Sequence, residues 1–350
     1  YRSRKRPLTT HLAFPMVVLV TGAAGFIGSH LAEALAANHT VIGVDDYSGG
    51  NNAPKNVRMF NVDLADDQNG QFSLPAVVAK YPPEILVHCA ANAREGESVY
   101  SPEKIVRANI WAYARTLRTC IAAGNLKRVM LFSSMSVYGH GAYPPPFDET
   151  SPVMPCDPYG GNKALMELLT HQLSEVHNFT SCIVRPHNVI GELQTLRDKF
   201  RNVAAIFMNK IMHGSPIMIY GDGKQVRAFS YIGDSLPCFV KAAEGHADGD
   251  TINIGGIAPI TVNELAQAIL EEFNTPDYPI IHIPDRVNEV KHAWCSYQKS
   301  VDILGYEETI GWREGITRMA KWAKEKGPQP WNDDERVELP KGKGLPSTWQ

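Results

Sequence analysis

Short apolar segments alternate with longer helical segments through the first half of the chain. The short segments, predicted as strands, are residues 16–21, 40–45, 57–62, 84–88, 128–132 and 180–184. Helices are predicted between them at residues 26–37, 72–80, 102–123 and 159–176. Strands that are apolar at nearly every position are typical of a parallel sheet covered by helices on both faces. With right-handed crossovers, the pattern predicts an α/β fold with a doubly wound, Rossmann-type parallel sheet.

The alternation becomes less regular after Arg185. Further helices are predicted at residues 200–213, 261–273 and 312–326, with loops and short strands between them. This composition is expected of a smaller α+β domain that closes over a ligand. We therefore assign residues 16–185 to a nucleotide-binding domain that carries the catalytic residues. Residues 186–326 are assigned mainly to a substrate-binding domain, some segments of which return to the first domain.

The two ends of the chain differ from this body. Residues 1–15 precede Met16 and are expected to be a flexible extension or a remnant of cloning. Residues 327–350 are rich in proline, glycine and charge, so we expect a mobile tail. The alternative is a strap whose Trp331 and Trp349 dock on the body or on a second subunit.

Composition limits the class of function. Among 350 residues, 34 basic and 37 acidic side chains give a net charge of −3, which argues against a nucleic-acid partner. The six cysteines include no C-x-x-C pair, so no metal site is predicted and a cytoplasmic, reducing location is the simplest inference. Residues 12–37 are nearly free of charge, but three glycines interrupt them. We interpret this stretch as strand, turn and helix, and expect neither a signal peptide nor a membrane anchor.

A glycine motif lies between the first predicted strand and the first predicted helix. Gly22, Gly25 and Gly28 stand there in the context that supports a dinucleotide-binding turn. The first glycine permits a tight turn, the second lets the backbone approach a pyrophosphate, and the third lets helix and strand pack closely. Backbone N–H groups at the helix start, at Phe26 and Ile27, can then bind the phosphates.

Acidic residues follow the second and third predicted strands. Asp45, with Asp46 beside it, stands where a carboxylate binds the adenosine ribose and repels the 2′-phosphate of NADP, so NAD is the predicted cofactor. Two nearby basic residues keep NADP as an alternative: Lys55 and Arg58. Asp63 and Leu64 end the third strand and are candidates for contact with the adenine, the alternative being an ordinary loop aspartate.

A tyrosine and a lysine lie four residues apart at the start of a predicted helix. Tyr159 and Lys163 then share one face, and the ammonium group is expected to lower the pKa of the phenol, which makes Tyr159 a candidate general base. The strand at residues 128–132 runs into a serine-rich segment that includes Ser134. A hydroxyl at the carboxyl end of a parallel strand points into the ligand crevice of such folds. The pattern predicts hydride chemistry, in which Tyr159 removes a hydroxyl proton while NAD takes a hydride from carbon.

With these motifs in this order, the chain resembles the extended short-chain dehydrogenases/reductases of the nucleotide-sugar epimerase and dehydratase family, above all their UDP-hexose 4-epimerases. The resemblance extends from Met16 to about Lys326. The motifs that carry it are residues 21–28, 88–91, Asn109, 133–139, 159–163, 185–188, 221–223 with Arg227, 253–255 and Arg286. It implies that Ser134 is the catalytic hydroxyl that shares the sugar's proton with Tyr159, and that Lys163 also holds the nicotinamide ribose.

The same resemblance implies the other site residues. Ala90 and Asn109 are expected in the cofactor site. The substrate site is expected to contain Ser134, Ser136, Asn188, Arg227, Arg286 and Ala293. Two arginines suit a diphosphate because each presents a planar fork of donors, whereas surface ion pairing is the alternative for either one alone.

The implied reaction is oxidation of the sugar at C4 to a 4-keto intermediate, which turns in the pocket before hydride returns to its other face. Dehydratases of the family carry Asp-Glu directly after the catalytic hydroxyl, where this chain has Met135-Ser136, so epimerisation is predicted. Seven residues beyond Arg286, Ala293 stands where restricted epimerases carry a bulky tyrosine. We therefore expect activity on UDP-GlcNAc and UDP-GalNAc as well as on UDP-glucose and UDP-galactose.

Several alternatives stay open from the sequence. A UDP-glucuronate 4-epimerase or another nucleotide-sugar oxidoreductase is the alternative enzyme, and a non-catalytic dinucleotide sensor is the alternative of another class. His187 replaces an aromatic residue of the family and is either a polar group of the substrate pocket or a core histidine. A homodimer is expected through the helix that carries Ala112-Tyr113, where the family usually has Gly-Thr.

Overall fold

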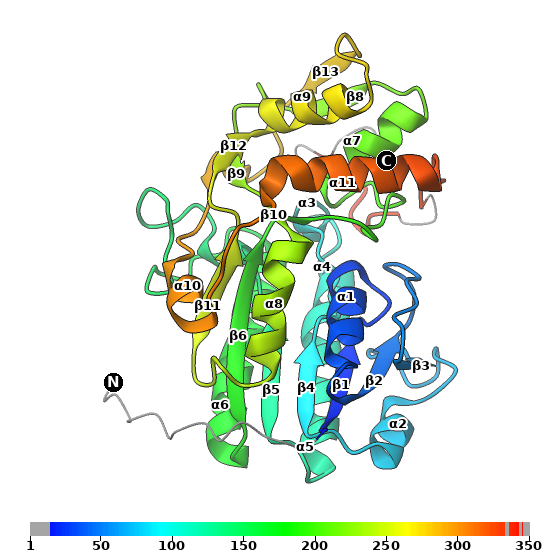
Figure 1. The fold of residues 1–350 in the computed structure, drawn as a ribbon, viewed down its shortest axis with the longest axis vertical. Helices are drawn as coiled ribbons and strands as arrows, with labels where there is room; N and C mark the ends of the chain where they lie inside the picture. Colours follow the sequence, from blue (N-terminus) through cyan, green and yellow to red (C-terminus); the bar gives the residue numbers. More distant parts are fainter. Residues whose placement is uncertain (1–14, 333–335, 343–344, 346–350) are drawn as a thin grey trace.

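A seven-stranded parallel sheet forms the centre of the structure (Figure 1). The computed structural model describes residues 15–332, 336–342 and 345. In chain order, the strands of the sheet are β1 Val17–Thr21, β2 Thr40–Asp45, β3 Arg58–Asn61, β4 Ile85–His88, β5 Arg128–Phe132, β6 Thr180–His187 and β11 Thr251–Gly255. Their spatial order is β11-β6-β5-β4-β1-β2-β3. The chain adds β2 and β3 on one side of β1 and the remaining strands on the other, so the order of strands reverses between β1 and β4. The predicted doubly wound fold is confirmed, and ligands bind such sheets beyond the carboxyl ends of the strands at this reversal.

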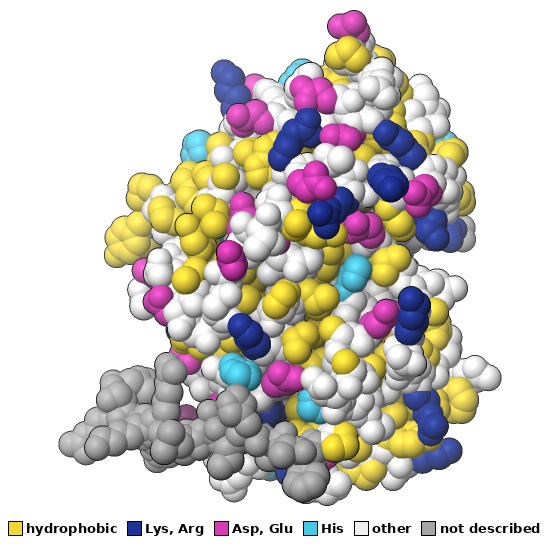
Figure 2. Space-filling model, viewed as in Figure 1, with side chains coloured by type: hydrophobic (Ala, Val, Ile, Leu, Met, Phe, Trp, Pro, Cys, Tyr) yellow, Lys and Arg dark blue, Asp and Glu magenta, His cyan; other side chains and the backbone are white. Residues whose placement is uncertain are grey.

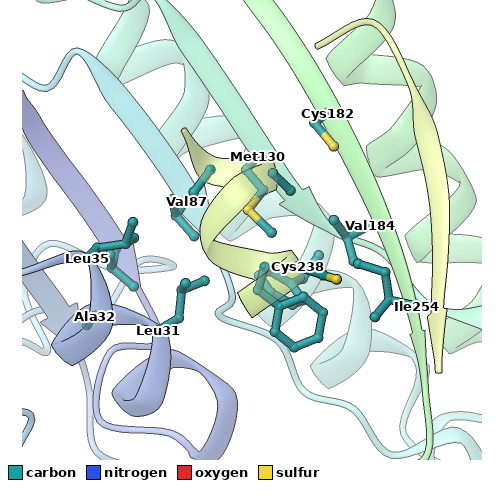
Figure 3. Close-up of a cluster of buried hydrophobic side chains, with 14 of the residues drawn as sticks. Leu31, Ala32, Leu35, Val87, Met130, Cys182, Val184, Cys238 and Ile254 are labelled. Atoms are coloured by element: carbon teal, nitrogen blue, oxygen red, sulfur yellow. The ribbon is translucent and has the colours of Figure 1, made fainter. Parts of the chain in front are cut away.

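Helices cover both faces of the sheet because its strands are apolar on both. One face carries α1 Phe26–Leu35, α8 Ile232–Ala243 and α10 Gln298–Leu304, and the other carries α2 Leu74–Lys80, α5 Ala112–Ala122 and α6 Pro158–His177. In β1, Val18 and Val20 join the cluster under α1 and α8, whereas Leu19 joins the cluster under α2, α5 and α6. Figure 3 shows the first cluster, in which Leu31 of α1 and Cys238 of α8 lie over the sheet.

A smaller group of elements lies beyond the carboxyl ends of the strands (Figure 1). Its helices are α7 Val203–Met212, α9 Val262–Glu272 and α11 Gly311–Lys326. Its strands pair as β8 Ile217–Tyr220 with β13 Ile280–Ile283, and β9 Val226–Ala228 with β12 Pro259–Thr261 and β14 His292–Ala293. A short pair, β7 Val189–Ile190 with β10 Ser230–Tyr231, connects this region to the sheet. These elements share a second core that includes Phe207, Leu265 and Met319.

Some elements were not predicted, for identifiable reasons. Helix α8 contains Pro237, which ordinarily marks a helix end, and it packs on α1 and the sheet although it lies in sequence between elements of the smaller region. The predicted helix at 102–123 is divided into α4 Pro102–Val106, a π-helical turn at Arg107–Trp111 and α5. The short helix α3 Glu95–Ser98 lies in the loop after β4, in a stretch without helical periodicity.

The described part of residues 327–350 makes contacts with the body of the protein. The backbone N–H of Asn332 bonds to the carbonyl of Arg197, and the N–H of Leu339 bonds to the carbonyl of Tyr100. Trp331 contacts the ring of His213, as the strap alternative required. Trp349 and residues 1–14 lie outside the described residues.

The surface and the cysteines agree with the composition. On the face shown in Figure 2, basic and acidic side chains are interspersed. All six cysteines are free thiols. Within the described ranges, no group of three metal-ligating side chains comes together, and no helix is long and apolar enough to cross a membrane.

A buried ion pair joins α6 to the end of β6. Arg185 donates two hydrogen bonds to Glu167, Nε to Oε1 at 2.9 Å and Nη2 to Oε2 at 2.6 Å, and a third to the hydroxyl of Tyr138 at 2.8 Å. The Ser133 hydroxyl donates to the same carboxylate. The Tyr138 hydroxyl donates in turn to Asn253 of β11 at 2.9 Å. All of these side chains are buried, so the network fixes α6 against the carboxyl ends of β5, β6 and β11.

We expect Glu167→Gln to lower the free energy of unfolding by about 3 kcal/mol, because it leaves the Arg185 charge buried and uncompensated. Urea unfolding followed by circular dichroism measures this change. Glu175→Gln, at an exposed position of the same helix, is the matched control and should change stability by less than about 0.5 kcal/mol. Equal urea midpoints for the two variants would contradict the role assigned to the ion pair.

Candidate active site

The glycine turn after β1 forms a cradle that larger side chains would fill. Gly22 has φ +67°, and a Cβ there would lie 2.8 Å from the backbone of Ala90. A Cβ on Gly28 would lie 2.0 Å from the carbonyl oxygen of Gly22. Gly25 is the N-cap of α1, so the free N–H groups of the helix start at Phe26 face the end of β1. This geometry fits the pyrophosphate of a dinucleotide.

Asp45, at the end of β2, lies against this turn. Its carboxylate accepts hydrogen bonds from the N–H of Ala24 at 2.8 Å and of Tyr47 at 2.7 Å. Burial raises the pKa of Asp45, and the bond from Ala24 opposes that rise. The neighbouring Asp46 is exposed and binds Ser48, so Asp45 is the carboxylate of the two that lies against the glycine turn.

Three other predicted cofactor residues have contacts within the protein, and their contact with a cofactor stays a prediction. Asp63 accepts a hydrogen bond from the N–H of Ala65 at 2.7 Å, as an ordinary loop aspartate does, and Leu64 is buried in the core. Asn109, on the π-helical turn, forms two hydrogen bonds with the backbone of Asn92, at 2.8 and 3.1 Å. Asn109 therefore holds the loop after β4 in place. Its contact with a cofactor stays a prediction.

One of the two basic residues behind the NADP alternative is engaged elsewhere. Arg58 donates to the hydroxyl of Tyr81 and lies over its ring, which does not favour a site for a 2′-phosphate. The backbone N–H of the other, Lys55, bonds to Glu33 of α1 at 3.0 Å.

A chain of hydroxyl groups begins at the end of β5. Ser134 is the N-cap of a 3₁₀ turn at Met135–Tyr138, and its Oγ lies 2.9 Å from the Oγ of Ser136. Ser136 donates to the carboxylate of Glu95 on α3 at 3.2 Å. A hydrogen bond with Ser134 also acts on the phenol of Tyr159. The catalytic serine predicted from the sequence is therefore linked to Tyr159 on one side and to a carboxylate on the other.

The expectation that Lys163 lowers the pKa of Tyr159 does not hold for the chain alone. Burial raises the pKa of Tyr159, and the Glu95 carboxylate raises it further, whereas the bond with Ser134 lowers it. The Nζ of Lys163 lies 5.8 Å from the centre of the tyrosine ring and donates to the carbonyl of Phe132 at 2.7 Å. The ammonium group is thus held over the ring and bound to the end of β5. Burial lowers the pKa of Lys163 itself to about 8.

Two carboxylates near these groups were missed by the sequence reasoning. Glu95 lies in the loop after β4, and no motif marked it. Asp157 is the N-cap of α6 and accepts a hydrogen bond from the N–H of Gly160 at 2.8 Å. Burial raises the pKa of Asp157 to about 6, and the nearby Glu95 carboxylate adds to the rise. The residue type and its position before Pro158 were a recognisable helix-start signal.

A cavity of about 480 Å³ extends from this hydroxyl chain into the smaller region. Its wall includes five of the six predicted substrate residues: Ser136, Asn188, Arg227, Arg286 and Ala293. Ser134 adjoins the cavity through Ser136. Glu95 and Asp157 line the same end. The structure therefore brings together residues that lie almost 200 positions apart in the sequence.

The two predicted substrate arginines meet at a carboxylate. Arg227 Nη2 and Arg286 Nε each lie 3.0 Å from an oxygen of Glu289, which is almost completely buried. Arg286 also lies over the ring of Tyr220 at 4.8 Å. Asn188 lies nearby with φ +40° and donates to the carbonyl of Ala228. Glu289, which the sequence reasoning missed, aligns both guanidinium groups on the cavity wall.

His187 fits the core alternative. Its ring is buried, and a Cβ on Gly255 would lie 2.1 Å from its Nε2. Burial lowers the pKa of His187 to about 4, so the ring is neutral near pH 7. It is not among the residues that line the described cavity.

Comparison with known proteins agrees with this site. Residues 18–255 match the family model described as "NAD dependent epimerase/dehydratase family". The UDP-glucose 4-epimerase of Mycolicibacterium smegmatis is 30% identical over 318 residues, which cover 89% of this chain and 99% of that protein. A dTDP-glucose 4,6-dehydratase of Streptomyces niveus is 28% identical and covers 88% of this chain and 92% of that protein.

Two solved structures have the same fold over most of their length. The UDP-glucose 4-epimerase of Thermotoga maritima with UDP-glucose superposes with a TM-score of 0.82 at 28% identity, covering 89% of this chain and 99% of that one. The UDP-glucuronic acid 4-epimerase of Bacillus cereus with UDP-glucuronic acid and NAD has a TM-score of 0.78 at 26% identity, covering 89% and 100%. The dinucleotide that the glycine cradle fits is therefore NAD.

We expect Gly28→Ala to abolish retention of NAD, because the new Cβ collides with the carbonyl of Gly22. The NAD released from the denatured, purified protein measures this. Gly161→Ala is the control, because a Cβ there meets no atom within 4 Å and should leave the NAD content unchanged. Full NAD content in a folded Gly28→Ala variant would contradict the assignment of the cradle.

Proposed function

The chain belongs to the NAD-dependent epimerase/dehydratase family, and we propose that within it the protein interconverts UDP-hexoses at C4 through a transient 4-keto sugar. The observation that carries this proposal is the hydrogen-bonded group of Ser134, Ser136 and Tyr159, which adjoins a cavity lined by two aligned arginines. The group is suited to proton transfer at a sugar hydroxyl. The arginines are suited to a diphosphate.

Each residue has a defined part in this reaction. Ser134 and Tyr159 bind the C4 hydroxyl, and Tyr159 takes its proton. NAD bound in the cradle supplies the hydride acceptor and a positive ring charge. The ammonium group of Lys163 is held by its hydrogen bond to the carbonyl of Phe132 and keeps a positive charge against the ring of Tyr159. Because the phenol is protonated in the chain alone, its activity as a base depends on the bound ligands.

Epimerisation is favoured over dehydration by the carboxylates available. Eliminating water from the sugar requires an acid and a base beside the keto centre. Met135 and Ser136 supply neither, and Asp157 is occupied as the N-cap of α6. Glu95 accepts a hydrogen bond from the hydroxyl of Ser136, and this contact suits the positioning of a sugar hydroxyl.

The charge of Glu95 also bears on the sugar class. A uronic acid carries a carboxylate at C6, one bond beyond the ring and close to C4. Within the cavity it would lie near the Glu95 carboxylate, and like charges at such distances repel appreciably. The Arg201 guanidinium group, which also acts on Tyr159, is paired with Asp198 at 3.4 Å. Neutral hexoses are therefore preferred over UDP-glucuronate.

Ala293 supports a wider pocket. It lies on β14 directly opposite Arg227 of β9 and lines the cavity with its methyl group. A bulky ring at this position would narrow the space beside the arginines. We therefore retain UDP-GlcNAc and UDP-GalNAc among the substrates.

A homodimer in the cytoplasm completes the proposal. Apolar side chains that are exposed on α4, the π-helical turn and α6 support a helical dimer face: Val106, Trp111, Leu165 and Leu168. Leu165 and Leu168 lie three residues apart and share one side of α6. The free thiols support a reducing compartment.

The function is tested by incubating the purified protein with UDP-glucose, UDP-GlcNAc, UDP-glucuronate and dTDP-glucose, followed by chromatography of the products. C4 epimers of the first two are expected, with UDP-glucuronate at least tenfold slower. A 4-keto-6-deoxy product would show that the protein dehydrates the sugar and would overturn the proposed epimerisation. Exclusive conversion of UDP-glucuronate would overturn the argument from Glu95.

We expect Tyr159→Phe to reduce the epimerisation rate roughly a hundredfold or more, because the variant lacks the proton acceptor. NAD content and UDP affinity should stay at wild-type values, which separates catalysis from binding. The control is Tyr143→Phe, at an exposed tyrosine outside the cavity wall. A variant that keeps more than a tenth of the wild-type rate would show that Tyr159 is not the base.

Ala293→Tyr should abolish conversion of UDP-GlcNAc while retaining conversion of UDP-glucose, because the ring occupies the space for an N-acetyl group. The ratio of the two kcat/KM values measures this specificity and should fall about a hundredfold. Ala293→Gly, which adds no volume, is the matched control. An unchanged ratio in the tyrosine variant would place the C2 substituent elsewhere.

A further inference from the structure

The segment that follows α11 is fixed firmly to α7. The N–H of Gln329 donates to Oδ1 of Asn209 at 2.9 Å, and Nδ2 of Asn209 donates to the carbonyl of Gln329 at 3.0 Å. Asn209 is completely buried, so this pair of bonds is shielded from water. On the other side, the N–H of Asn332 donates to the carbonyl of Arg197 at 3.0 Å. Trp331 therefore stands between two fixed points of the backbone.

The indole of Trp331 lines the active-site cavity. The Nζ of Lys210, in the last turn of α7, lies 5.9 Å from the centre of the ring. The ring of His213 lies 6.2 Å away. These contacts hold the indole against the carboxyl-terminal end of α7, where Lys210 also lines the cavity.

The position of Trp331 along the cavity follows from the direction of α7. The helix begins after Asn202, next to Arg201, whose charge acts on Tyr159. Lys210 comes eight residues after Asn202, which corresponds to about 12 Å of helix. Trp331 thus lies at the Lys210 end of α7, about that length of helix away from the end next to Arg201. A nucleotide sugar whose C4 hydroxyl lies at Tyr159 would direct its base toward the Lys210 end.

A second attachment joins the described part of residues 336–342 to helix α4, which lies beside the sheet. The Glu338 carboxylate accepts hydrogen bonds from the N–H groups of Glu103 and Lys104, at 3.0 and 2.7 Å, in the first turn of α4. Val337 is buried against Tyr100. The described parts of residues 327–342 thus contact α7 in the smaller region and α4 beside the sheet.

We propose that residues 327–332 are part of the substrate site, and that Trp331 forms the wall against which the base of the bound nucleoside diphosphate stacks. This inference rests on the proposed function for the kind of ligand. Every nucleobase has an aromatic face, so an indole at this place contributes affinity for the nucleotide while it takes no part in the chemistry. Trp331 is a binding residue for the base and acts at a distance from the reacting carbon.

Calorimetry with UDP and with inorganic pyrophosphate tests the proposal. Trp331→Ala should raise the Kd for UDP about tenfold and leave the Kd for pyrophosphate unchanged, since pyrophosphate has no base to stack. Trp331→Phe, which keeps an aromatic ring, should stay within about threefold of the wild type. Tyr143→Ala removes an exposed ring outside the cavity wall and is the control. In the epimerase assay, Trp331→Ala should raise KM about tenfold and change kcat less than twofold.

The outcomes separate this inference from the proposed function. A Trp331→Ala variant with wild-type UDP affinity and a lowered Tm would show that the segment only stabilises the fold, which overturns the inference. UDP binding that depends on Trp331, in a protein that epimerises no UDP-sugar, would support the inference and overturn the proposed function. A wild-type protein that does not bind UDP would overturn both.

Discussion

The buried ion pair between Glu167 and Arg185 is the constraint on which the active site depends. Glu167 lies on α6, one turn beyond Lys163, and Arg185 lies near the end of β6. Two charges removed from water are stable only with their hydrogen bonds complete, and this pair completes them through Ser133 and Tyr138. Because the same helix carries Tyr159 and Lys163, the ion pair fixes the position of both residues relative to β5 and to Ser134, which follows that strand.

Charges of both signs line the cavity. The carboxylates of Glu95 and Asp157 and the guanidinium group of Arg201 act on Tyr159, and the arginines aligned by Glu289 line the same cavity. Burial and the negative charge of Glu95 raise the pKa of Tyr159. The phenol is therefore a poor base in the chain alone.

The sequence predicted the parts of the structure that short-range patterns determine. Apolar strands, the glycine turn and the spacing of Tyr159 and Lys163 each act over fewer than ten residues. Neither helix α8 nor strand β11 was predicted. Pro237 interrupts the helical pattern of α8, and both elements pack with the rest of the sheet only through contacts between segments that are distant in sequence. Glu95, Glu289 and Trp331 enter the site through tertiary contacts that no local motif marks. The lowered pKa expected for Tyr159 was wrong because the spacing of Tyr159 and Lys163 does not reveal that the phenol is buried or that the Glu95 carboxylate lies near it.

The central claim is that the protein oxidises a nucleotide sugar at C4 and returns the same hydride to the opposite face. The most direct test uses UDP-glucose labelled with deuterium at C4, incubated with the purified protein in ordinary water. The account predicts UDP-galactose that retains the deuterium at C4, because the hydride stays within the closed site until it is returned. Loss of the label to solvent, or its appearance at another carbon, would contradict the account.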